Sequence, residues 1–270
     1  MENTIKSPLR YPGGKSKALA QILAHLPSHI TDYREPFIGG GSVFLAIRQL
    51  LGENLHHYWI NDLNYDLYCF WACVQHNLDQ LTTDIQKIKQ HQCNGRQLFK
   101  SLTADHQELT QLQRAVRFFV LNRITFSGTV ESGGYSQHAF EQRFTDSAIQ
   151  RLANLGPCLA GVKITNLDYD ALLQAPGEDV FIFLDPPYLS ATSSKLYGKK
   201  GDLHTAFNHQ RFAENMQKCP HRWLITYDDS SEIRDLFSFA QIFEWDLQYG
   251  MNNYKQKKAA RGKELMIKNY

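Results

Sequence analysis

The sequence contains no long run of apolar residues. No stretch approaches the roughly 20 apolar residues that a membrane-spanning helix needs, and Met1 to Arg10 lack the apolar centre of a signal peptide. The five cysteines include no Cys-x-x-Cys pair, and the 11 histidines have no spacing that would close a zinc site. We therefore expect a cytoplasmic protein with free thiols, no structural metal and no membrane segment.

Excess charge is also scarce, with a formal net charge of +2 over 270 residues. A balance this mild does not by itself indicate a polyanionic partner. The basic residues nevertheless form two groups, Lys195, Lys199 and Lys200, and then Lys255, Lys257, Lys258, Arg261 and Lys263. A solvated surface usually explains one such group, but two that flank a candidate active site favour contact with phosphate.

Strand and helix patterns alternate in the first part of the chain. A short strand from Tyr33 leads into glycines 39–41 and then into a helix that reaches Leu51, with Ser42 placed to cap that helix. A second strand at 58–60 ends at Asn61-Asp62, and a helix begins near Asn64. This succession predicts a β-α-β unit.

The segment from about 66 to 157 is rich in Gln, Leu and basic residues and poor in strand signals, which predicts a helical insertion. Strand patterns return at 162–165, 180–184, 223–226 and 264–267. The run at 180–184 is continuously apolar, as in a strand that is buried on both faces of a parallel sheet. We therefore expect a mostly parallel α/β sheet interrupted by a helical subdomain.

Residues after the first two strands indicate a nucleoside pocket. Ligands of open α/β sheets bind beyond the C-terminal strand ends, and glycines at 39–41 let the backbone approach one closely. Asp62 lies 21 residues beyond Gly41, near the offset at which an acid reaches a ribose hydroxyl. Dinucleotide binding is the rival, but Phe44 stands where G-x-G-x-x-G requires glycine. The alternative stays open that the glycines are there only for steric reasons, as in many strand–helix turns.

Gly13-Gly14-Lys15-Ser16 is similar to the end of a phosphate-binding P-loop. Leu9 stands where that motif requires glycine, and no apolar strand precedes it. We therefore expect Lys15 to serve another ligand group or only to lie in a turn.

The strongest signal is Asp185-Pro186-Pro187-Tyr188, directly after the buried strand. A carboxylate in this position is costly unless a group binds to it, and the prolines fix the backbone that follows. Asp185 and the Pro186 carbonyl can each accept a hydrogen bond from an exocyclic NH2 group, while the Tyr188 ring can stack on a base. A proline-stiffened turn is the alternative. The position favours chemistry on an amino group.

The motifs together resemble the Dam-like (alpha-group, D12 class) DNA adenine N6-methyltransferases. In that family's order, the chain has residues 10–15 (RYPGGK), 35–44 (EPFIGGGSVF), 61–64 (NDLN) and 185–188 (DPPY). The resemblance covers nearly the whole chain. It implies a Rossmann-like methyltransferase sheet built from residues 1–67 and 158–270, with an inserted helical target-recognition domain at 68–157.

The resemblance implies S-adenosyl-L-methionine as cofactor and S-adenosyl-L-homocysteine as product. The implied cofactor-binding residues are Tyr11, Lys15, Phe37, Gly39, Gly41, Asp62 at the ribose, Asp168 near the adenine and Asp185 near the methionine part. For Asp168, a solvated acid in a turn is the alternative. The target adenine would be flipped onto Tyr188, and its N6 would attack the sulfonium methyl directly, with Asp185 and Pro186 steering the amine.

Residues 121–128 (LNRITFSG) resemble the family's segment that enters DNA. The resemblance implies that Phe126 wedges into the base stack, that Asn122 and Arg123 support the loop, and that Ser127 contacts DNA. An ordinary helix end with a buried Phe126 is the alternative.

Position 131 departs from the family pattern. Glu131 stands where GATC-specific relatives have an arginine that reads guanine. A carboxylate cannot donate to guanine, although it can accept from cytosine N4. We expect a short recognition site other than GATC, with Lys255, Lys257 and Lys258 in a loop that clamps phosphates.

The leading hypothesis is a site-specific adenine N6-methyltransferase that acts on double-stranded DNA as a monomer or weak dimer. A separately acting restriction endonuclease stays open as a partner. The alternatives are an RNA adenine or cytosine-N4 methyltransferase, or a catalytically silent nucleic-acid-binding module. The presence of every residue that the chemistry needs argues against the silent module.

Overall fold

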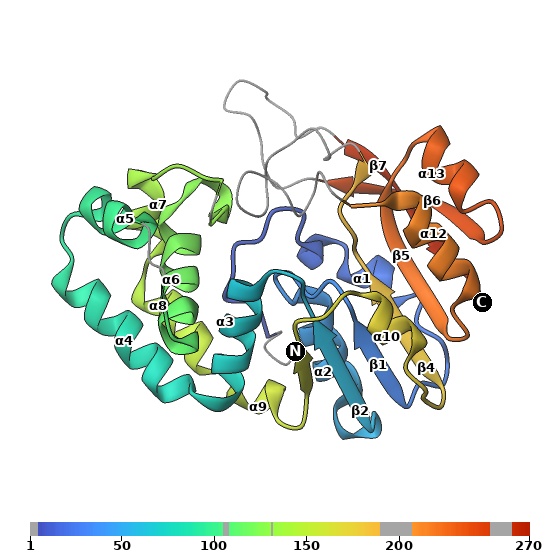
Figure 1. Ribbon diagram of the computed structural model, residues 1–270, viewed down its shortest axis with the longest axis horizontal. Coiled ribbons are helices and arrows are strands. Elements are labelled where there is room, and N and C mark those ends of the chain that lie inside the picture. The colour runs from blue at the N-terminus through green and yellow to red at the C-terminus, as the bar shows by residue number, and fades with distance from the viewer. Residues whose placement is uncertain (1–4, 105–107, 131, 190–206, 249–260) are drawn as a thin grey trace.

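The computed structural model describes all residues except 1–4, 105–107, 131, 190–206 and 249–260. Within this part of the chain, seven strands form one sheet in the order β3-β2-β1-β4-β5-β7-β6 (Figure 1). The strands are β1 (Asp32–Glu35), β2 (His57–Asn61), β3 (Lys163–Thr165), β4 (Val180–Leu184), β5 (Arg222–Asp228), β6 (Gln241–Gln248) and β7 (Arg261–Lys268). The first five in sheet order run parallel, whereas β7 is antiparallel to both β5 and β6. The predicted mostly parallel sheet is confirmed.

Helices cover both faces of the sheet. Phe181 and Phe183 of β4 belong to a core that includes α1 (Leu19–Leu23) and α2 (Ser42–Leu51). Ile182 and Leu184 instead share a core with α10 (Asp170–Gln174), α12 (His209–Lys218) and α13 (Ser231–Leu236). Successive side chains of a strand point to opposite faces, so burial on both sides explains why β4 is apolar throughout.

The segment between β2 and β3 is helical, as predicted. It contains α3 (Tyr65–His76), α4 (Leu78–His91), α5 (Gly95–Thr103), α6 (Gln111–Ile124), η3 (Phe126–Gly128), α7 (Gln137–Arg143), α8 (Asp146–Ala153) and α9 (Gly156–Leu159). Figure 1 shows α4 to α8 gathered on the left, with α3 between them and the sheet. Cys69 and Cys73 are buried on α3. None of the helices in the described ranges is long and apolar enough to cross a membrane.

The predicted helix start near Asn64 is confirmed, and the predicted Ser42 cap is wrong. The Asn64 side chain accepts hydrogen bonds from the amides of Asp66 and Leu67 and caps α3. Ser42 does not cap α2, because it is already the first helical residue and Gly41 is the N-cap. Gly41 has a φ of +69°, a conformation that glycine adopts without the strain a side chain would add. The left-handed glycine turns the chain into the helix one residue earlier than a serine cap would.

The sequence pattern gave no indication of β6. This strand pairs with β7 alone and forms the edge of the sheet. Its partner β7 (Arg261–Lys268) is the last strand in the sequence, but in the sheet it lies between β5 and β6. Two short 3-10 helices, η1 (Lys15–Lys17) and η2 (Gly52–Asn54), complete the described elements.

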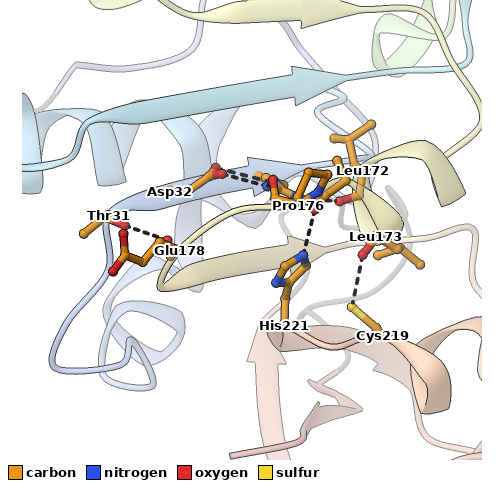
Figure 2. Close-up of polar contacts among 10 residues, drawn as sticks. Thr31, Asp32, Leu172, Leu173, Pro176, Glu178, Cys219 and His221 are labelled. Atoms are coloured by element: carbon orange, nitrogen blue, oxygen red, sulfur yellow. Dashed lines mark hydrogen bonds and ion pairs between the residues drawn. The ribbon is translucent and has the colours of Figure 1, made fainter.

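An arginine whose guanidinium donors are all hydrogen-bonded lies at the amino-terminal side of the sheet. Arg34 of β1 is 1% exposed, and its Nε and Nη2 donate to Asp32 at 3.3 and 2.7 Å. Its remaining donors reach the carbonyls of Leu172, Ala175 and Pro176 at 2.7–2.8 Å. The loop before β4 is thereby fixed to β1, as Figure 2 shows for Asp32, Leu172 and Pro176. All five guanidinium donors are used.

Candidate active site

The informative residues meet at one edge of the sheet. β2, β1 and β4 are adjacent and parallel, so their C-terminal ends lie side by side. Asp62 follows β2, the glycine turn follows β1, and Asp185 follows β4. This is the edge at which an open α/β sheet binds its ligands.

Asp185 is held by a lysine from the N-terminal segment. Lys15 Nζ lies 2.8 and 2.9 Å from the two carboxylate oxygens and also donates to the Gly13 carbonyl at 3.0 Å. Thr226 Oγ1 of β5 donates to Asp185 Oδ1 at 2.8 Å. Lys15 is 3% exposed, whereas the Asp185 side chain keeps 22% of its surface open. The Gly13–Ser16 turn therefore brings its lysine into the site, and the carboxylate remains accessible.

Tyr188 stands next to this ion pair. Lys15 Nζ lies 4.8 Å from the centre of the Tyr188 ring, and the ring stacks on Tyr227 at a centroid distance of 5.9 Å. The Tyr188 hydroxyl donates to Oε2 of Glu264 at 3.0 Å, and Glu264 is fully buried on β7. Pro186 lies between Asp185 and Tyr188 in the sequence and is buried. Its ring restricts the backbone that connects these two side chains. Carboxylate, ammonium and aromatic ring form one cluster.

The glycine turn is enclosed by two aromatic side chains. A Cβ at Gly39 would lie 2.9 Å from the Tyr11 ring, and a Cβ at Gly41 would lie 2.7 Å from the Trp71 ring. Trp71 Nε1 also donates to the Gly39 carbonyl at 3.1 Å. Both glycines have positive φ values, +45° and +69°. The turn needs glycine for its conformation and for these close contacts.

Asp62 ties the glycine turn to the end of β2. Its Oδ2 accepts from the Gly39 amide and its Oδ1 from the Asn64 amide, both at 3.0 Å. Burial raises the pKa of Asp62 to about 6, and the two amide hydrogen bonds act against this rise. A second acid, Glu35 at the end of β1, is fully buried and accepts from the Tyr33 hydroxyl at 2.5 Å, and burial raises its pKa well above the usual range. Three carboxyl groups therefore occupy neighbouring strand ends.

Phe37 and Asp168 lie toward α10 and α12. Phe37 is partly buried in an aromatic cluster with Tyr169 and Phe212 at centroid distances of 5.6 and 6.1 Å. The Asp168 side chain is 48% exposed and is paired with Arg211 at 3.2 Å. Asp168 thus lies on the surface beside this cluster. Its ion pair with Arg211 is compatible with a cofactor-binding acid and equally with a solvated acid in a turn.

Two apolar residues at this edge were not predicted as site residues from the sequence. Leu63 follows β2 and is 56% exposed, and Leu167 follows β3 and is 44% exposed. Asn166 joins the two strand ends by donating to the carbonyls of Asp62 and Leu63 at 2.7 and 2.9 Å. A single apolar residue among the polar residues just after a strand was the available signal, because such a side chain has no core to enter. Glu264 carried no such signal.

The predicted DNA-entering loop presents one residue and buries two. Phe126 is 62% exposed, which contradicts the alternative of a buried phenylalanine at an ordinary helix end. Asn122 is fully buried, and Ser127 has a φ of +54° in the turn that follows Phe126. Arg123 is 4% exposed beneath the loop, with its guanidinium 5.5 Å from the Phe119 ring.

Arg123 lies in a strongly cationic surrounding. Burial lowers its pKa to about 9, and the charges of Arg151, Arg10 and Arg143 lower it further in the same direction. Its Nε is buried with no hydrogen-bond partner among the described residues. Asn122 donates to the Gly128 carbonyl of the loop at 2.9 Å, whereas the Arg123 guanidinium lies over the Phe119 ring of α6. Glu131 and the basic residues Lys255, Lys257 and Lys258 lie outside the described residues.

Comparison with known proteins agrees with this geometry. The family model described as D12 class N6 adenine-specific DNA methyltransferase matches residues 11–251. A type II methyltransferase of Methanocaldococcus jannaschii is 25% identical over 70% of this chain and 72% of its own length. A type II methyltransferase of Lactococcus lactis subsp. cremoris is 22% identical over 84% of this chain and 74% of its own length. A DNA adenine methylase of Haemophilus influenzae is 23% identical over 96% of this chain and 91% of its own length.

The family model covers the motifs from Tyr11 through the Asp185–Tyr188 tetrapeptide, and it leaves out Arg10 and the basic residues at 255–263. Members of this family are enzymes that use S-adenosylmethionine as methyl donor. The chain belongs to the D12 class of N6 adenine-specific DNA methyltransferases.

Proposed function

We propose that this site methylates N6 of an adenine extruded from duplex DNA, with Asp185, Pro186 and Tyr188 as the catalytic residues. One observation carries the proposal most directly. Lys15 Nζ donates to both Asp185 oxygens while it stands 4.8 Å from the Tyr188 ring centre. The Lys15 ammonium thus already places a nitrogen donor next to both a carboxylate and an aromatic ring. An adenine amino group needs the same two neighbours.

The chain's own residues would act by positioning the amine. Asp185 and the Pro186 carbonyl accept its two hydrogen bonds, which localises the nitrogen lone pair, and Tyr188 supports the base plane. Thr226 holds the carboxylate from behind, and Glu264 fixes the tyrosine hydroxyl. The open fraction of Asp185 admits the substrate.

The cofactor site would lie across the ends of β1, β2 and β4. We assign it to Tyr11, Lys15, Phe37, Gly39, Gly41, Asp62, Asp168 and Asp185. Bound S-adenosylmethionine would supply an electrophilic methyl group. The acids suit its positive charges, Asp62 keeps lone pairs for ribose hydroxyls, and exposed Leu63 and Leu167 provide apolar surface at adjacent strand ends. The residues present therefore fit this cofactor.

DNA contact would fall on the loop after α6 and on the basic segment near the C-terminus. We assign Phe126 to the wedge, Asn122 and Arg123 to support of the loop, and Ser127, Lys255, Lys257 and Lys258 to contact with DNA. The exposure of Phe126 above two buried polar residues supports this division. Glu131 suits a base other than guanine, so we propose a recognition site different from GATC.

Target recognition would reside in residues 68–157 and catalysis in 1–67 with 158–270. Helix α3 crosses the first of these boundaries, because it begins at Tyr65. We further infer a cytoplasmic enzyme that acts as a monomer or weak dimer. A restriction endonuclease acting separately would be its partner if it serves restriction-modification, as the names of two relatives indicate for those proteins.

Base mapping tests this proposal. The chain would be expressed in a host that lacks adenine methylation, and modified bases in genomic DNA and total RNA would be sequenced, with an Asp185→Ala variant as the inactive control. We expect N6-methyladenine at one short DNA motif and none in the control. N4-methylcytosine, methylation confined to RNA, or full activity in the control would each overturn it.

A further inference from the structure

Asn122 joins the DNA-entering loop to the N-terminal segment of the chain. Its Oδ1 accepts from the Arg10 amide at 2.9 Å, and its Nδ2 donates to the Arg10 carbonyl at 2.8 Å. The same Nδ2 donates to the Gly128 carbonyl at 2.9 Å. A single side chain, fully buried, thus satisfies both backbone groups of Arg10, as a neighbouring strand would, while it also holds the loop.

The two backbones that Asn122 joins also touch one another. A Cβ at Gly128 would lie only 2.1 Å from the Arg10 carbonyl oxygen. The Arg10 guanidinium adds a longer contact, with Nη1 at 3.4 Å from the Thr125 carbonyl. Phe126 lies between Thr125 and Gly128, so the loop contacts Arg10 on both sides of the exposed phenylalanine. A shift of the loop therefore moves Arg10 or breaks these contacts.

The segment that starts at Arg10 ends in the catalytic cluster. Tyr11 packs on the glycine turn, where a Cβ at Gly40 would lie 2.8 Å from Tyr11 Cβ. The Gly14 amide then bonds to the Tyr11 carbonyl at 3.1 Å and closes a tight turn. Lys15 follows and pairs with Asp185. Six residues therefore connect the loop of Phe126 with the cofactor turn and the carboxylate.

We propose that Asn122 is a positioning residue that couples the Phe126 loop to the Arg10–Lys15 segment, so that DNA at the loop and cofactor at the glycine turn change each other's affinity. The inference rests on the proposed roles of the loop and of the turn. It assigns to Asn122 a role beyond support of the loop, because its hydrogen bonds run to the segment that carries Tyr11 and Lys15. Such coupling is reciprocal and typically amounts to about 5- to 150-fold in affinity.

Hydrogen exchange of the wild-type protein gives a first test without any substitution. S-adenosylhomocysteine would be used as ligand, so that no turnover occurs. We expect it to slow exchange in peptides covering residues 10–15 and 37–41 and also in those covering 121–130. Protection confined to 10–15, 37–41 and 62–64, with 121–130 unchanged, would overturn the proposal, because the loop would then not sense the cofactor.

Binding measurements on variants give the second test. The Kd of S-adenosylhomocysteine would be measured by calorimetry with and without a duplex that contains the mapped recognition site. We expect DNA to change this Kd at least about fivefold in the wild-type protein and less than about twofold in Asn122→Ala. Gly128→Ala should also reduce the factor, because its Cβ would push Arg10 away from the loop.

Gln75→Ala is the matched control. Gln75 is a partly buried amide on α3 that donates to the carbonyls of Leu159 and Val162, both at 2.7 Å, away from the loop and the site. We expect this variant to lose stability but to keep the wild-type factor. Equal factors in Asn122→Ala and Gln75→Ala, or no effect of DNA in the wild type, would overturn the coupling. Failure of the proposed function would appear separately, as absent methylation in the base-mapping experiment.

Discussion

Among the described residues, two cation–carboxylate pairs have a buried cation, one pair at the amino ends of the strands and one at their carboxyl ends. Arg34 and Asp32 lie toward the amino-terminal side, where the arginine is 1% exposed and every donor has a partner. Lys15 and Asp185 lie at the carboxyl edge, where the carboxylate keeps 22% of its side-chain surface open. The charges are similar, but the surroundings differ.

The difference separates a structural pair from one that can exchange partners. Arg34 binds three carbonyls besides Asp32, and Gly177 is packed so closely that its Cβ would lie 2.5 Å from Arg34 Nη2. Nothing can enter there without breaking several hydrogen bonds. Among the described residues, Asp185 is bonded to Lys15 and Thr226, and part of its side-chain surface is open, so a substrate amine can reach it and replace one partner.

The largest effect is expected for Asp185→Asn. An asparagine amide can present a donor where the adenine amine needs an acceptor, so methyl transfer should fall about a thousandfold. Single-turnover assays on the mapped site would measure the rate. The free energy of unfolding should fall by about 2 kcal/mol or less, because the asparagine amide oxygen can still accept from the buried Lys15. If the Asp185→Asn variant keeps a tenth of the wild-type rate, Asp185 has only a structural role, like Asp32.

Arg34→Met should have the largest effect on stability. It leaves Asp32 buried without its cation and three carbonyls without donors, which costs about 3–5 kcal/mol. Urea unfolding would measure the loss, and activity per folded molecule should be unchanged. Arg222→Met is the control, because Arg222 also pairs with an aspartate, Asp179, but is 30% exposed, so about 1 kcal/mol is expected. Equal losses in the two variants would remove the distinction.

Lys15→Met should reduce cofactor affinity more than stability, which is the reverse of Arg34→Met. Asp185 would keep the Thr226 hydrogen bond and could be hydrated through its open surface, so unfolding should cost about 2 kcal/mol or less. Cofactor affinity should fall about tenfold or more through the loss of a charged hydrogen bond. Urea unfolding and calorimetric titration together check this. A stability loss as large as that of Arg34→Met, with unchanged affinity, would contradict the comparison.

The smallest effect concerns pH at the carboxyl edge. With a pKa of about 6, the Asp62 carboxyl is almost fully ionised at about pH 7.5 but only about one quarter ionised at about pH 5.5. The ionised form accepts ribose hydroxyls, so the Kd of S-adenosylhomocysteine should rise about fourfold over this range. The raised pKa also means that Asp62 favours folding most at low pH, and that this contribution is lost as the pH rises through about 6.

Calorimetry at the two pH values measures this change. Asp62→Asn is the control, because it should bind more weakly at both values and show no such slope. A slope that persists in the Asp62→Asn variant would assign the titration to another group.

The sequence predicted elements that depend on local pattern. The apolar strand β4 and the helix start near Asn64 are set by neighbouring residues and are confirmed. The Ser42 cap is wrong because two residue types compete locally, and the left-handed Gly41 takes the position. β6 gave no signal, since an edge strand needs only one buried face.

Contacts between distant residues could not be predicted. Lys15 and Asp185 are 170 residues apart, and nothing in either motif shows that one turns toward the other. The same holds for Tyr188 and Glu264 and for Arg34, which appeared only as one residue of a short strand. These pairs follow from strand order, which brings β4 between β1 and β5.

The route of the chain between β2 and β3 matters for engineering. The two strands are parallel neighbours, with Trp59 opposite Lys163, so the excursion of α3 to α9 leaves at the carboxyl end of β2 and returns at the amino end of β3. A segment from a relative can replace it while the strands keep their register, provided that it spans these two ends. The graft must nevertheless match the host at Arg10, because the transplanted helix would bring its own residue to the position of Asn122. Chimeras that exchange this segment therefore require two junctions and one compatible backbone contact.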